Sequence, residues 1–179
     1  MNLKVVNLSG YEIPAVKEVH NGNWVEYGDD NNYFGELIER YLGSPTNSRC
    51  INGISDMIYG RGLDALDSSE KPEMYGKMKA LLTSECVKKV SSDLKMLGQA
   101  AVQVIYKNKK KEIASLHHFP METLRAEKAV NGKVEAYYYH SKWSDIKPSD
   151  KPKRIPTFRN GTRSQRIELY IIKPYKAGF

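Results

Sequence analysis

Two lysine-rich runs in the second half of the sequence hold the residues best suited to bind phosphate groups, at residues 107–111 and 147–154. Lysine and arginine neutralise the phosphates of nucleic acids without reading the base sequence. The predicted phosphate contacts are Lys107, Lys109, Lys110, Lys111, Lys151, Lys153 and Arg154. Neither run belongs to a helix-turn-helix, zinc-finger or RNA-recognition motif, so the runs alone do not define a nucleic-acid-binding domain.

Three consecutive tyrosines, Tyr137, Tyr138 and Tyr139, are of a type that can stack against bases. On a strand, however, Tyr137 and Tyr139 point to one face and Tyr138 to the other. This alternation favours packing within a sheet over base stacking.

Metal-binding chemistry has two candidate segments. His117 and His118 are adjacent, and neighbouring side chains on a strand point to opposite faces, which is poorly suited to binding one metal ion. Ordinary strand histidines are therefore the favoured interpretation. The acidic stretch at residues 29–32 lacks the alternating acidic positions, the central glycine and the final glutamate of a calcium-binding EF-hand. We interpret this stretch as the cap of a helix.

Nucleotide and nucleophile motifs are absent from the sequence. No glycine-rich phosphate-binding pattern occurs, and no serine or cysteine lies in a recognisable nucleophile motif. We therefore expect a protein that is not an enzyme and has no cofactor, no metal ion and no catalytic residue.

Charge is divided unevenly along the 179 residues. Residues 1–80 carry 8 Lys and Arg against 12 Asp and Glu, a net charge of −4, whereas residues 81–179 carry 20 against 9, a net charge of +11. A polyanion near the second half is one explanation, and an acidic face of one subunit meeting a basic face of its neighbour is another. The simplest alternative is a solvated surface that is rich in lysine.

Composition is typical of an ordinary globular chain, with 40% hydrophobic and 27% charged residues. No apolar run approaches the roughly 20 residues of a membrane helix, and the first residues lack the apolar core of a signal peptide. We therefore expect no membrane partner and a cytosolic location. Cys50 and Cys86 are far apart, without metal-binding spacing, and are expected to be buried, reduced thiols.

Helical periodicity dominates the first part of the chain. The first expected helix, 33–42, is begun by Asn31 and Asn32 and ended by Gly43. A second follows Ser44 and Pro45, and its apolar stripe is Cys50, Ile51, Ile54, Met57 and Ile58. A third is expected over 72–82, and a fourth from Thr83 or Ser84 to Gly98. Gly60 and Gly62 are expected to end the second of these helices. The buried face of the last is expected to hold Cys86, Val87, Val90, Leu94 and Leu97.

Alternating, strand-like patterns follow Gly98. Two hairpins are expected, one from strands 100–106 and 113–117, and one from 124–127 and 134–139 around Asn131-Gly132. The stretch 143–156 has three prolines and is expected to be a loop or linker, and 167–172 a last strand without partners. The sequence thus predicts an α+β fold in which N-terminal helices precede antiparallel hairpins, forming an incomplete, truncated domain. Its expected parts are an N-terminal arm or edge strand (1–20), a helical part (21–98) and a β-rich part (99–179).

Several ordered segments resemble the N-terminal wing region of portal proteins from tailed bacteriophages, in particular phages and prophages of Bacteroides-like hosts. The segments are Trp24–Tyr33, Tyr41–Asn47 with its continuation to Ile58–Leu63, Leu97–Tyr106, the turn His118–Arg125, Tyr137–Trp143 and Ile155–Phe158. Together they span roughly residues 20–175, although such portal proteins continue well beyond this length.

The resemblance implies a structural subunit of the ring through which viral DNA passes. For that family, it implies self-assembly into a ring of about a dozen subunits. It also implies terminase and head-tail adaptor proteins as partners, viral DNA in the channel, and a location in the virion or the cytoplasm of the bacterial host. The alternative that the residues leave open is a stand-alone basic module that binds nucleic acid.

Overall fold

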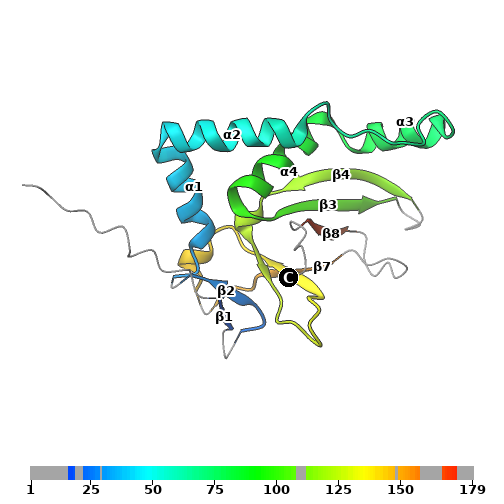
Figure 1. Cartoon of the computed structure of the whole chain (residues 1–179). Coiled ribbons are helices and arrows are strands. Elements are labelled where there is room, and N and C mark those ends of the chain that lie inside the picture. The colour runs from blue at the N-terminus through cyan, green and yellow to red at the C-terminus, as the bar shows by residue number, and fades with distance from the viewer. Residues whose placement is uncertain are drawn as a thin grey trace, which may run out of the picture.

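In the described part of the chain, four helices and three small antiparallel sheets form an α+β fold, as the sequence predicted (Figure 1). The computed structural model describes residues 16–18, 22–28, 30–107, 112–147, 149–157 and 167–172. The helices come first in the chain, and most of the strands follow them.

The first two helices are α1 (Tyr33–Gly43) and α2 (Pro45–Tyr59), which run in different directions from a sharp corner at Ser44 (Figure 1). The Ser44 side chain accepts a hydrogen bond from the backbone N–H of Asn47, and Pro45 occupies the first helical position, as predicted. Gly60, with φ +51°, then ends α2. The order of cap, proline and glycine was therefore sufficient to place both ends of α2.

The predicted apolar stripe of α2 is only partly buried. Met57 is 73% exposed, Ile58 is 52% exposed, and Cys50 is exposed as well, so the expectation of two buried thiols was wrong for Cys50. The buried residue of α2 is Ser55. Helix α2 packs mainly against α4, and this contact leaves Met57 and Ile58 exposed.

The other two helices are α3 (Pro72–Leu81) and α4 (Ser84–Leu97). Thr83 caps α4 through its side-chain oxygen, and Gly98 ends it in the left-handed conformation with φ +75°. Helix α4 lies between α2 and the central sheet, whereas no residue of α3 is buried (Figure 1). Helix α3 therefore projects from the molecule with little packing of its own.

The central sheet has the strand order β4-β3-β8, built from β3 (Ala100–Tyr106), β4 (Ile113–Phe119) and β8 (Ile167–Ile172). The β3–β4 hairpin was predicted. The interpretation of 167–172 as a strand without partners was wrong, because β8 pairs antiparallel with β3 over its whole length. Strand β8 completes the sheet from a distant part of the sequence, so no local pattern revealed its partner.

The second sheet has the order β5-β6-β7, with β5 (Leu124–Ala126), β6 (Ala136–Tyr139) and β7 (Lys153–Pro156). The β5–β6 hairpin turns at Asn131 and Gly132, which both have positive φ, as predicted. The expected loop at 143–156 instead contains a short 3-10 helix (Trp143–Asp145) and strand β7. Strand β7 lies at a sheet edge, where proline is tolerated.

A third, two-stranded sheet pairs β1 (Val16–Glu18) with β2 (Val25–Tyr27). Strand β1 is the described part of the expected N-terminal arm or edge strand. In the described ranges, no helix combines the length and the apolar character needed to span a membrane.

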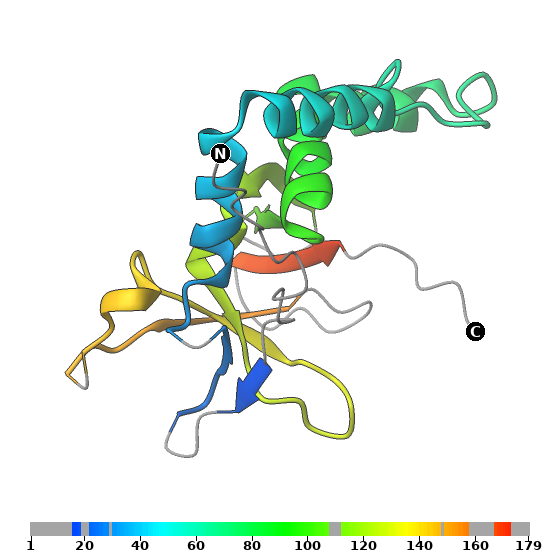
Figure 2. The same cartoon turned by 60° about the vertical axis from the view of Figure 1, so that its left-hand side comes forward.

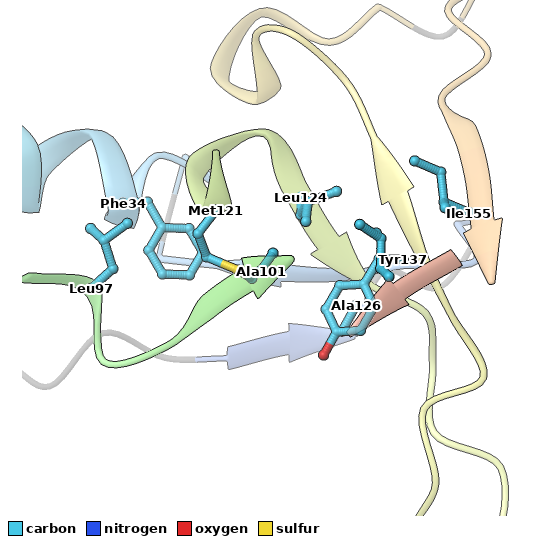
Figure 3. Close-up of a cluster of buried hydrophobic side chains, with 9 residues drawn as sticks. Phe34, Leu97, Ala101, Met121, Leu124, Ala126, Tyr137 and Ile155 are labelled. Carbon is cyan, nitrogen blue, oxygen red and sulfur yellow. The ribbon is translucent and has the colours of Figure 1, made fainter. Parts of the chain in front are cut away.

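One hydrophobic core joins α1 and α4 to both larger sheets (Figure 3). Its buried members are Phe34, Leu97, Ala101, Met121, Leu124, Ala126, Tyr137, Ile155 and Leu169. They come from α1, α4, β3, β5, β6, β7 and β8 and from the turn before β5, so these elements hold one another in place.

Candidate functional site

Among the described residues, a buried group with many hydrogen bonds is the guanidinium of Arg125, on β5, which is 2% exposed. Its Nε donates to Oδ1 of Asn31 at 2.5 Å, and its Nη2 donates to the Asn31 carbonyl oxygen. Its Nη1 donates to the carbonyl oxygens of Glu122 and Leu124 at 3.0 and 2.9 Å. One side chain thus ties β5 and the turn before it to the segment that precedes α1.

Three aromatic rings surround this guanidinium. Its central carbon lies 5.8 Å from the ring centroid of Tyr27, 5.3 Å from that of Phe34 and 5.2 Å from that of Trp143. Aromatic faces stabilise a cation that is shielded from water. Burial nevertheless lowers the pKa of Arg125 to about 10, against the opposing influence of Tyr27 and Glu26. The group stays charged at neutral pH, where it binds neutral acceptors.

Asn31 adopts a left-handed conformation, with φ +58°. Asparagine tolerates this conformation better than most residues do. Its Oδ1 also accepts a hydrogen bond from the backbone N–H of Tyr27. The prediction that residues 29–32 cap the helix was therefore wrong for Asn31, whose side chain accepts a hydrogen bond from Arg125 instead. Asn32 does precede α1, but its side chain makes no capping hydrogen bond, and Asp29 lies outside the described residues.

Further aromatic residues pack beside the rings that surround Arg125. The Trp24 ring contacts those of Tyr138 and Trp143 at centroid distances of 5.7 and 5.5 Å, and Nε1 of Trp143 donates to the Thr123 carbonyl oxygen at 2.8 Å. The three consecutive tyrosines pack as predicted, with Tyr137 in the core, Tyr138 against Trp24, and Tyr139 edge-on to Phe119.

The described members of the predicted phosphate contacts lie in or beside two different sheets. Lys107 follows β3 and forms an ion pair with Glu112 at 2.8 Å. Arg154, in β7, makes two hydrogen bonds to Glu127, of 2.7 and 2.8 Å. Lys151 and Lys153 are exposed, and Lys109, Lys110 and Lys111 lie outside the described residues. These ion pairs already compensate the charges of Lys107 and Arg154. Phosphate binding by the predicted residues stays a prediction.

The two histidines have separate partners. The His117 ring lies 3.0 Å from the Ser115 hydroxyl, whereas Nε2 of His118 lies 2.7 Å from Oδ2 of Asp93 on α4. Across the part of the chain that the structure describes, no three His, Cys, Asp or Glu residues gather in a group that could hold a metal ion. The His118–Asp93 pair fastens α4 to β4.

An open hollow of about 340 Å³ lies between α4 and the central sheet. Its apolar wall includes Val87 and Val90 of α4, Val102 and Val104 of β3, and Ile172 of β8. Small-molecule sites usually add a few polar groups that orient the ligand. This hollow therefore offers packing surface rather than acid–base chemistry.

Comparison of the chain with protein-family models gives no match, and comparison with curated proteins gives none either.

The structure itself adds one relationship that the sequence reasoning missed. Asn31 and Arg125 belong to two segments that lie far apart in the sequence, Trp24–Tyr33 and His118–Arg125, and they bind each other directly. Because the contact joins residues 94 positions apart, no local pattern in the sequence indicated it.

Proposed function

We propose that this chain is a structural, non-enzymatic subunit, or the N-terminal part of one, of the portal ring of a tailed bacteriophage. In this role it forms part of the wing around the channel for viral DNA. Copies of the same chain are its first partners, and terminase and head-tail adaptor proteins dock on the assembled ring. The ring belongs to the virion and assembles in the cytoplasm of the bacterial host.

The observation that carries the proposal is direct contact between the segments that resemble portal proteins. Trp24–Tyr33 and His118–Arg125 meet through the Arg125–Asn31 hydrogen bonds, and Trp143, from a third such segment, covers the same guanidinium. Leu97 and Ala101, from a fourth, lie in the common core. Segments that are separate in the sequence therefore build one centre, which is compatible with the single fold that the resemblance implies.

The many hydrogen bonds and ring contacts of this centre suit a scaffold. Its charged group binds neutral acceptors and faces aromatic rings instead of an open cleft. The hollow beside α4 is apolar. Both features favour packing and assembly over catalysis.

Electron microscopy and mass photometry of the purified chain test the proposal. We expect closed rings with a central channel. A chain that stays monomeric and binds duplex DNA with an affinity that falls steeply as salt rises would instead support the nucleic-acid-binding module. The exposed Lys151 and Lys153 are the residues on which that alternative depends.

A further inference from the structure

The projection around α3 exposes apolar side chains beside a cluster of carboxylates. Leu66 is fully exposed and Met74 is 61% exposed. Residues 64–73, called the acidic loop below, carry Asp64, Asp67, Glu70 and Glu73 against Lys71, a net charge of −3. All four carboxylates are exposed. Exposed apolar side chains next to charged ones can form part of a protein–protein contact.

The segment around the start of β7 has the opposite charge. Residues 147–154, called the basic segment, carry Lys147, Lys151, Lys153 and Arg154 against Asp150, a net charge of +3. All four cationic side chains are exposed. Arg154 forms an ion pair with Glu127, whereas the three lysines form none with any carboxylate in the described ranges. Lysines and prolines on an edge strand also discourage unwanted strand pairing, which is the simplest alternative role.

An aromatic side chain lies beside the basic segment. Tyr139 is directly opposite Lys153 across the β6–β7 pair, so their side chains share one face of the sheet. Tyr139 is 36% exposed, although its ring contacts Phe119. This face therefore combines positive charge with apolar surface, as the acidic loop combines negative charge with apolar surface.

The two surfaces lie at opposite ends of the molecule, with the acidic loop beyond α2 and the basic segment beside β7 (Figures 1 and 2). One copy therefore cannot bring its own two surfaces together. Two different surfaces on one chain make a head-to-tail contact, which closes into a ring or continues as a filament.

We propose that the acidic loop of one copy binds the basic segment of a second copy, with Leu66 and Met74 packed against Tyr139. The partner is a second copy of this chain, chosen because the two surfaces match in charge and in apolar character. The inference rests on the proposed function, since a ring subunit must present two different surfaces to its two neighbours.

Charge exchange tests the contact. One variant carries Asp64→Lys and Glu70→Lys, and another carries Lys151→Glu and Lys153→Glu. We expect sedimentation velocity at low salt to show association of the wild-type chain, weakened by about tenfold or more in each variant alone. A 1:1 mixture of the two variants should associate again, because the reversed loop then meets the reversed segment. Leu66→Ser should weaken association as well.

Glu39→Lys with Asp56→Lys is the matched control, because both carboxylates are exposed and lie outside the acidic loop. It should associate like the wild type. A wild-type chain that stays monomeric at its highest soluble concentration would overturn the inference, as would a mixture that fails to recover.

The outcomes separate this inference from the proposed function. If the wild type forms rings and both charge-reversed variants form them too, the proposed contact is wrong but the proposed ring subunit still stands. Association that recovers in the mixture but yields no closed ring in electron micrographs would support the contact and count against the portal ring.

Discussion

Nε of Arg125 donates a hydrogen bond of 2.5 Å to Oδ1 of Asn31, which lies 94 residues earlier in the chain. The bond connects β5 to the residue that precedes the N-cap of α1. Because both residues are buried, water cannot replace either partner if the other is removed. The stability of this region should therefore depend on the pair more than on any exposed ion pair.

We predict that Arg125→Met lowers the free energy of unfolding by about 3–5 kcal/mol, because it leaves several buried oxygen acceptors without a donor. Urea denaturation followed by circular dichroism measures the change. Arg154→Met is the matched control, since it removes an arginine whose ion pair with Glu127 is partly exposed, and it should cost about 1 kcal/mol or less. Equal costs for the two variants would contradict the importance of the buried centre.

The buried centre also shows where sequence reasoning reached its limit. Local signals placed the helix ends correctly, because Ser44, Thr83 and Gly98 act on backbone groups within a few residues of themselves. The Asn31–Arg125 bond depends on tertiary folding, and the local preference of asparagine for helix caps pointed elsewhere. Prolines near β7 indicated a loop, whereas an edge strand accommodates them.

Tyr137 should make the protein sensitive to alkaline pH. Burial raises the pKa of Tyr137 to about 12, and the nearby Tyr27 acts in the same direction. An unfolded tyrosine has a pKa of about 10. Below that pH both states keep the proton and the full stability remains; between about 10 and 12 only the unfolded chain releases it, so stability falls as pH rises.

Tyr137→Phe should therefore reduce the loss of stability between pH 10 and 12, by about 2 kcal/mol at the upper end. Urea denaturation at a series of pH values gives this difference between variant and wild type. Tyr139→Phe, on the same strand but exposed, serves for comparison and should follow the wild-type curve. Parallel curves for wild type and Tyr137→Phe would show that the buried phenol does not govern alkaline unfolding.

Two glycine replacements should change stability in opposite directions. Gly98 has φ +75°, a conformation that costs other residues about 1–2 kcal/mol, so Gly98→Ala should lower the melting temperature. Gly53 is inside α2 with open space around it, and Gly53→Ala should stabilise the helix by about 0.5–1 kcal/mol. Thermal unfolding of both variants checks the pair, and a stabilising Gly98→Ala would rule out the left-handed end of α4.

The two thiols should react at very different rates with an aromatic disulfide reagent such as DTNB. Cys50 is exposed on α2, whereas Cys86 is buried against the central sheet, and burial raises the pKa of the Cys86 thiol. Since the thiolate is the reactive form, one thiol per native chain should react quickly and the second only after unfolding. Cys50→Ser should abolish the fast phase, and Cys86→Ser should leave it intact. Fast reaction of both thiols in the folded chain would mean that α4 does not cover the sheet as described.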